Sequence, residues 1–108
     1  MLEYVWRFTI NQGQQNEFIE WLRANGEDLK NHTRPGSTYL GTWITVNGLG
    51  AYSGEARWAL DGYASLGEGW GDQISQRLLS EWLAMTDHIH RDATLLRSVE
   101  TVQSLPDV

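Results

Sequence analysis

The sequence of 108 residues predicts an α+β domain whose elements follow the order strand, helix, strand, strand, helix, strand. Three observations predict this order. Apolar residues alternate with polar ones over residues 2–10, apolar residues recur at helical spacing over 14–31 and 72–88, and an Asn-Gly pair separates two β-rich stretches. Elements in this order make the split βαβ or ferredoxin-like arrangement, a four-stranded antiparallel sheet with both helices on one face.

The composition is typical of a single domain over residues 1–108, with a polar tail at 103–108. Hydrophobic residues make up 41% and charged residues 20% of the chain, which is close to average globular usage. A domain of this size buries enough apolar surface to fold without disulfides or structural metals. The absence of cysteine excludes disulfides, thiolate metal sites and cysteine nucleophiles.

The charge and the hydropathy pattern restrict the partners. A formal net charge of -6 argues against nucleic acid and against anionic membranes. No apolar run approaches the roughly 20 residues that a membrane-spanning helix needs. The start of the chain lacks the basic and apolar regions of a signal peptide. We therefore expect a cytoplasmic protein with no nucleic-acid or membrane partner.

The first strand and the first helix follow from periodicity. Residues 2–10 alternate aromatic or aliphatic side chains with polar ones, which is typical of a half-buried strand. From Gln14 to Asn31 the apolar residues recur at three- and four-residue steps, which predicts one helix with Gly26 as its weak point. Arg34 and Pro35 end it, because a residue before proline avoids helical angles.

The remaining elements are predicted by turn and capping signals. Strands at 37–46 and 51–60 flank Asn47-Gly48 and should form a hairpin. Residues 63–66 read as a short helical turn. Asp72 is the predicted N-cap of a second long helix that ends near His88, and 94–102 returns to strand composition.

A sheet with both helices on one face leaves its other face uncovered. Apolar residues of the strands, Val5 among them, fall on one side or the other whichever face the helices cover. A second copy of the chain that packs sheet against sheet would remove this exposed patch. We therefore expect a two-fold homodimer.

Two stretches of the sequence resemble the dimeric α+β barrel superfamily, which includes antibiotic-biosynthesis monooxygenases, NIPSNAP-like proteins and stress-responsive barrel proteins. They are Ile10-Asn11-Gln12-Gly13 followed by Phe18, and the segment from Tyr52 to Trp58 followed by Tyr63-Ala64-Ser65-Leu66. The resemblance covers nearly the whole chain. It implies a homodimer, a cavity, and in the enzymatic members oxidation or rearrangement of small aromatic or polyketide-like substrates without a tightly bound cofactor. A haem-binding or haem-degrading relative, which would use an Asn, a Trp and a His, is a minor alternative.

Strict alternation divides the strand residues into an aromatic set and a polar set. The aromatic set is expected beneath the helices and consists of Tyr4, Trp6, Phe8, Tyr39, Trp43, Tyr52 and Trp58. The polar set is expected to face the dimer cavity and consists of Glu3, Arg7, Thr9, Thr42, Ser53, Glu55 and Arg57. A slip of one residue in the register would exchange the sets and line the cavity with Tyr4, Trp6, Trp43 and Trp58.

The charged members of the polar set are the candidate catalytic residues. Arg7 and Arg57 would orient an anionic or phenolic substrate, and Glu55 would act as general base. The alternative is an ion-pair network of structural importance only, because buried charges need partners whatever the function. The candidate ligand-binding residues are Thr42, Ser53, Tyr63 and Trp70. Trp70 lies between two glycines and is either a lid over the cavity or a plug that anchors its loop.

His88 and His90 form a weak metal-ligand pattern, which a position at a helix end explains equally well. His32, also just past a helix, is a weaker candidate. Neither a phosphate-binding loop, a dinucleotide fingerprint nor an HExxH motif is present. We expect no metal and no cofactor.

The function classes that remain are a homodimeric cavity enzyme, a ligand-binding protein and a structural protein. The enzyme would be a cofactor-independent monooxygenase, isomerase or cyclase that acts on a small-molecule ligand. The second class is a ligand-binding or stress-responsive barrel without turnover. The third is a homo-oligomer whose cavity is filled by its own aromatic side chains.

Overall fold

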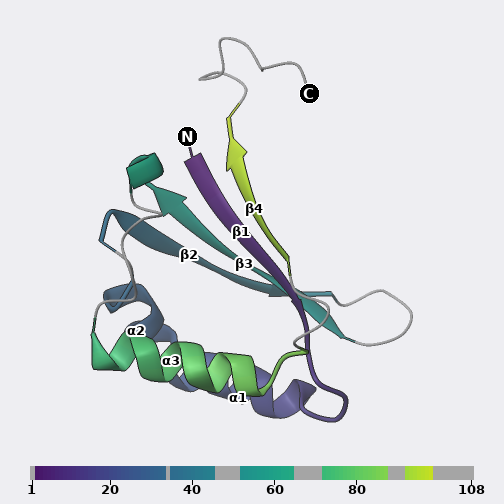
Figure 1. Cartoon of the computed structure of the whole chain (residues 1–108). Helices are drawn as coiled ribbons and strands as arrows, with labels where there is room; N and C mark the ends of the chain where they lie inside the picture. Colours follow the sequence, from purple (N-terminus) through teal and green to yellow (C-terminus); the bar gives the residue numbers. More distant parts are fainter. Residues whose placement is uncertain (1, 34, 46–51, 65–71, 88–91, 99–108) are drawn as a thin grey trace.

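The computed structural model describes residues 2–33, 35–45, 52–64, 72–87 and 92–98. An antiparallel sheet contains four strands in the order β2-β3-β1-β4: β1 (Leu2–Thr9), β2 (Ser37–Ile44), β3 (Ser53–Leu60) and β4 (Asp92–Arg97). Three helices, α1 (Gln15–Ala24), α2 (Gly26–Asn31) and α3 (Gln73–Ala84), lie on one face of this sheet (Figure 1). The predicted α+β, ferredoxin-like fold is therefore confirmed.

The predicted first helix is divided into α1 and α2. Asn25 lies between them, and its side-chain amide donates a hydrogen bond of 2.9 Å to the carbonyl of Trp21, in the last turn of α1. Gly26, the expected weak point, is the first residue of α2. The local backbone preferences of Asn and Gly thus place the break.

Helix α3 begins where the sequence predicts and ends earlier. The carboxylate of Asp72 accepts a hydrogen bond of 2.7 Å from the backbone N–H of Ser75, as an N-cap residue does. The helix ends at Ala84 instead of near His88, because Thr86 makes a β-bridge with Ile10 and the N–H of Asp87 donates to the carbonyl of Thr9. Pairing with the end of β1 replaces the next helical turn.

The core lies between the helices and the sheet and is mainly aromatic. The Phe8 ring meets Phe18 at 5.4 Å and Trp82 at 5.3 Å between centroids, with edge-to-face geometry in both pairs. Trp6 stacks on Trp82 at 5.3 Å, and Trp58 contacts the rings of its strand neighbours. Such pairs add stabilisation beyond the area that they bury. The prediction that Tyr4, Trp6, Phe8, Tyr39 and Trp58 lie beneath the helices is confirmed.

A β-bulge in β2 overturns part of the predicted division of faces. Tyr39 pairs with Trp58 and Gly41 pairs with Arg57, so that Leu40 has no partner on β3. An extra residue in one strand reverses the faces of every residue that follows it. The placement of Trp43 beneath the helices and of Thr42 on the polar face is therefore wrong: Trp43 lies on the uncovered face, opposite Glu55, and Thr42 lies on the helix-covered face.

Several predictions concern residues outside the described parts of the chain. These are the Asn47-Gly48 turn, Ser65 and Leu66, Trp70, His88 and His90, the strand beyond residue 98 and the tail at 103–108. Tyr63 and Ala64 do begin a short helical turn. No helix in the described part of the chain is long and apolar enough to span a membrane.

Candidate functional site

The face of the sheet opposite the helices, here called the open face, carries both charged and apolar side chains. In the strand register, alternate residues of β1 occupy it together with Glu55 and Arg57 of β3 and Leu96 of β4. Val5 lies at its centre, between Arg57 and Thr94 of the neighbouring strands, and has no exposed surface. Since Val5 is outside the core cluster beneath the helices, the side chains of the open face themselves bury it.

Four charged side chains of the open face form a continuous network over β1 and β3. Glu55 is at its centre, with Oε1 3.2 Å from Nε of Arg7 and Oε2 2.7 Å from Nη2 of Arg57. Arg57 also reaches Oε1 of Glu3 at 3.4 Å. At the other end, Nη1 of Arg7 donates to the hydroxyl of Thr94 at 3.1 Å. The predicted grouping of Arg7, Glu55 and Arg57 on one face is confirmed.

The network is charge-balanced and partly exposed. Its two guanidinium groups face two carboxylates, and the side chains of Arg7 and Glu55 are 45% and 25% exposed. The hydrogen bond from Arg57 to Glu55 is the main cause that raises the pKa of Arg57 above its ordinary value. Ion pairs of this exposure contribute little to stability, so the stability of the domain does not by itself require the network.

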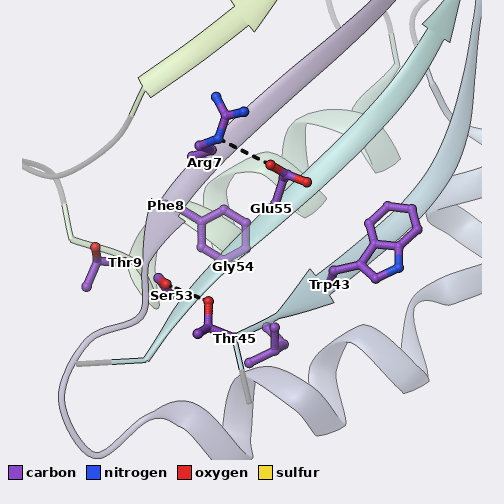
Figure 2. Close-up of a pocket in the computed structure, with 9 residues that line it drawn as sticks. Arg7, Phe8, Thr9, Trp43, Thr45, Ser53, Gly54 and Glu55 are labelled. Carbon is purple, nitrogen blue, oxygen red and sulfur yellow. Dashed lines mark hydrogen bonds and ion pairs between the residues drawn. The ribbon is translucent and has the colours of Figure 1, made fainter. Parts of the chain in front are cut away.

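A hollow of about 420 Å³ lies where β1 and β2 end and β3 begins, and we call it the sheet-end hollow. Its lining consists of Arg7, Phe8, Thr9, Trp43, Ile44, Thr45, Ser53, Gly54 and Glu55. Figure 2 shows the Arg7–Glu55 pair on one side and Trp43 on the other, with the Thr45 and Ser53 hydroxyls joined at 2.9 Å near the strand ends. Volumes of roughly 300–1,000 Å³ are typical of small-molecule sites.

Trp43 is the residue of this site that the sequence analysis placed on the wrong face. Its side chain is 52% exposed, and the guanidinium carbon of Arg57 lies 5.6 Å from the ring centroid. Gly41 lies next to the indole, and a Cβ at Gly41 would be in ordinary van der Waals contact with it, 3.4 Å from Cη2 of Trp43. Gly41 has a φ of +136°, which other residues rarely adopt. A glycine within a strand is the sequence signal for such a bulge.

The other predicted ligand-binding residues do not share one location. Ser53 lines the sheet-end hollow. Thr42 lies on the helix-covered face, where its hydroxyl is hydrogen-bonded to that of Tyr39. Tyr63 follows the other end of β3, is 59% exposed and accepts a hydrogen bond of 3.4 Å from Arg97. Thr42 and Tyr63 are therefore not part of the hollow.

Burial raises the pKa of the Tyr39 hydroxyl, and its hydrogen bond with Thr42 lowers this pKa by a smaller amount. Both residues lie on the helix-covered face beside the bulge, and neither lines the hollow.

His32 connects two helices. Its Nδ1 lies 2.8 Å from Oδ2 of Asp72, and the Ser75 hydroxyl donates to the His32 carbonyl at 2.6 Å. The backbone hydrogen bond from Ser75 and then the contact with His32 lower the pKa of Asp72 to about 2. Within the described ranges no group of three or more His, Cys, Asp or Glu side chains is placed to hold a metal ion.

The hollow offers three kinds of chemical group. Arg7 supplies a cation, Trp43 a half-exposed aromatic surface, and Thr9, Thr45 and Ser53 supply hydroxyls. Both oxygens of Glu55 already lie against guanidinium groups, Oε1 in an ion pair with Arg7 and Oε2 as the acceptor of a hydrogen bond from Arg57, so a substrate proton would have to compete with these cations for its lone pairs. This set can bind a small molecule that combines a ring with polar substituents.

Comparison with known proteins identifies the fold. No protein-family model and no curated protein matches the sequence. Among solved structures, the chain is similar to an uncharacterized NIPSNAP domain protein from Burkholderia xenovorans, with a TM-score of 0.68 and 19% identity over 99% of this chain and 100% of that one. It is also similar to a protein of Nitrosomonas europaea named for antibiotic biosynthesis monooxygenases, with a TM-score of 0.66 and 10% identity over 92% and 99% of the two chains.

A third similar structure is a mutant form of SnoaB, a cofactor-independent oxygenase from Streptomyces nogalater. The TM-score is 0.56 at 17% identity, over 98% of this chain and 97% of that one. The expected likeness to NIPSNAP and antibiotic-biosynthesis monooxygenase proteins is thus confirmed at the level of the structure. The chain has the α+β, ferredoxin-like fold that these proteins share.

Proposed function

We propose that the chain is a homodimeric small-molecule-binding protein whose two open faces pack against each other. The observation that carries the proposal is the sheet-end hollow, which combines a cation, an aromatic surface and hydroxyls on the face that α1, α2 and α3 leave uncovered. Leu96, an apolar side chain on the same face that is 41% exposed, favours a partner of similar character. A second sheet over the hollow would exclude water and strengthen its polar contacts.

The proposed ligands are small aromatic or polyketide-like molecules. Arg7 would orient an anionic or phenolic substituent, and Ser53 would supply a hydrogen bond from its hydroxyl. Arg57 has a different role from the one that we expected for it. It does not line the hollow, and its guanidinium group forms ion pairs with Glu55 and Glu3. Its proposed role is therefore to position Glu55, which does line the hollow.

Cofactor-independent oxygenation is the catalytic form of this proposal, and the likeness to SnoaB favours it. In such a reaction Glu55 would remove a proton from an activated CH₂ group of the substrate. Dioxygen would then give one atom to the new carbonyl, and its other atom would leave as water with the two hydrogens. A barrel that binds the same ligands without turnover is the alternative function.

Native mass spectrometry of the purified protein tests the binding proposal. We expect the mass of a dimer, with additional small-molecule mass that disappears under denaturing conditions. A monomer at micromolar concentration would contradict the proposed assembly. A dimer that remains free of added mass, even after incubation with hydroxynaphthalenes, would contradict the small-molecule function.

Measurement of oxygen consumption distinguishes an oxygenase from a protein that binds the same ligands without turnover. An oxygenase is expected to accelerate oxygen uptake by an anthrone-like substrate over its rate without protein, and Glu55→Gln should abolish most of the acceleration. Glu17→Gln, on the surface of α1, is the matched control. Binding without acceleration would favour the non-catalytic function.

A further inference from the structure

We infer that Trp43 is a stacking platform in the sheet-end hollow, which makes this site selective for planar aromatic rings over saturated rings of the same size. The inference rests on the proposed small-molecule function and specifies the shape of the ligand. It assigns a binding role to Trp43 and a positioning role to Arg57.

The indole lies beside Gly41 and Arg57. A Cβ added at Gly41 would make ordinary van der Waals contact with the ring, at 3.4–3.8 Å from Cη2, Cζ3 and Cζ2. The guanidinium carbon of Arg57 lies 5.6 Å from the ring centroid, within the range of a cation–π interaction. A ring whose position is fixed before binding loses little conformational entropy when a ligand stacks on it.

Arg57 is itself fixed by its carboxylate partners. Its Nε and Nη2 lie 2.8 and 2.7 Å from Oε2 of Glu55, and its Nη1 lies 3.4 Å from Glu3. Arg57 is absent from the lining of the hollow, whereas Trp43 and Glu55 are part of it. The charged network therefore determines where the indole lies without itself occupying the ligand space.

The indole is also available to a ligand. It is 52% exposed although it belongs to a strand paired with β3, and it forms one wall of a hollow of about 420 Å³. The bulge at Leu40 is the cause, because it turns Trp43 away from the helices.

The test compares 2-naphthol with decahydro-2-naphthol, which share a carbon skeleton and each carry one uncharged hydroxyl, phenolic in the first and alcoholic in the second. We expect the purified protein to bind 2-naphthol about fivefold to tenfold more tightly, the ratio expected for one aromatic pair. Because the hydroxyls also differ, stacking is measured by the change in this ratio: Trp43→Leu should lower it severalfold, and Trp43→Phe should retain part of it. Tyr63→Leu removes an equally exposed ring at the far end of β3 and should leave the ratio unchanged.

Two spectroscopic measurements complete the test. The Trp43 indole N–H resonance, identified by its loss in Trp43→Phe, should shift when 2-naphthol is added. Arg57→Met should move this resonance in the free protein and lower the ratio about twofold, because the ring then loses its cation–π contact.

The outcomes distinguish the stacking role of Trp43 from the proposed small-molecule function. Equal affinity for the two alcohols in the wild-type protein would leave the small-molecule function intact and overturn the platform. If neither alcohol binds, both proposals fail. If Trp43→Leu converts a dimer into a monomer, Trp43 is a subunit contact and the platform is overturned.

Discussion

Gly54 shows how closely one residue of β3 is matched to the core. It pairs with Phe8 of β1, and a Cβ at Gly54 would lie 2.6 Å from Cζ of the Phe8 ring. That ring is 2% exposed and packs against Phe18 and Trp82, so it has no room to move away. The absence of a side chain at Gly54 is therefore a requirement of the aromatic packing on the other strand.

We expect Gly54→Ala to lower the free energy of unfolding by about 1–3 kcal/mol, as overpacking of a filled core does. Gly62→Ala is the matched control, because nothing lies within 4 Å of a Cβ at Gly62, and it should change stability by less than about 0.5 kcal/mol. Urea unfolding followed by tryptophan fluorescence gives both values. Equal stability of the two variants would show that the Phe8 ring can move aside.

At the scale of elements, the start of α3 depends on one carboxylate. Asp72 caps the helix and contacts His32, so it fixes α3 relative to the end of α2. Its pKa is lowered to about 2 from an ordinary 3.8, which means that the folded state favours the ionised form. The stabilisation is fully present above pH 3.8 and is lost as the pH falls towards 2.

Asp72→Ala should accordingly lower the Tm by several degrees at neutral pH. The difference from the wild-type protein should decrease when thermal unfolding is repeated at pH values between 3.8 and 2. Asp61→Ala removes an exposed carboxylate outside α1, α2 and α3 and serves as the control. A difference that stays constant with pH would mean that the carboxylate charge is not responsible.

Two glycines in different elements should respond to alanine in opposite directions. Gly41 in the bulge has a φ of +136°, and Gly26 at the start of α2 has free space around a Cβ. Gly41→Ala is expected to destabilise the protein by about 1–3 kcal/mol through backbone strain. Gly26→Ala should stabilise it by about 0.4–1 kcal/mol, because it restricts the unfolded chain. Urea unfolding of both variants checks the pair, and a loss of stability in Gly26→Ala would contradict the second expectation.

The sequence predicted the elements well because each of them has a local signal. Alternation identified β1, helical spacing identified α1 and α3, and Asp72 marked the start of α3. It also brought Arg7, Glu55 and Arg57 together, since all three lie on strands β1 and β3, outside the bulged strand. The end of α3 was wrong because a long-range bridge between Thr86 and Ile10 decides it.

The face of Trp43 could not be predicted from alternation. Leu40 has no partner on β3, so each later residue of β2 faces the opposite side of the sheet from the one that alternation predicts. The pattern of apolar residues in the sequence does not show where such an extra residue lies. The neighbouring Gly41 is the one sequence feature that indicates irregular pairing. Sequence patterns therefore identified the charged part of the hollow and missed its aromatic wall.

For the whole molecule, the proposed dimer predicts different effects for two adjacent leucines. Leu96 pairs with Glu3 on the open face and Leu95 pairs with Tyr4 on the helix side, and their exposures are similar at 41% and 36%. Leu96→Asp should shift the assembly from dimer to monomer, because it places a charge between two sheets. Leu95→Asp should leave the dimer intact. Light scattering after size-exclusion chromatography measures both, and equal effects would contradict packing through the open face.

The bulge in β2 also has a consequence for solubility at high concentration. In the strand order β2-β3-β1-β4, β2 is an edge strand, whose outer backbone groups can pair with the edge of another molecule. The extra residue at Leu40 and the unusual backbone of Gly41 interrupt the regular spacing of those groups. A regular edge could recruit further chains into an open-ended sheet, whereas the irregular one limits growth in that direction. We therefore expect the distortion that turns Trp43 towards the hollow to reduce aggregation through the β2 edge as well.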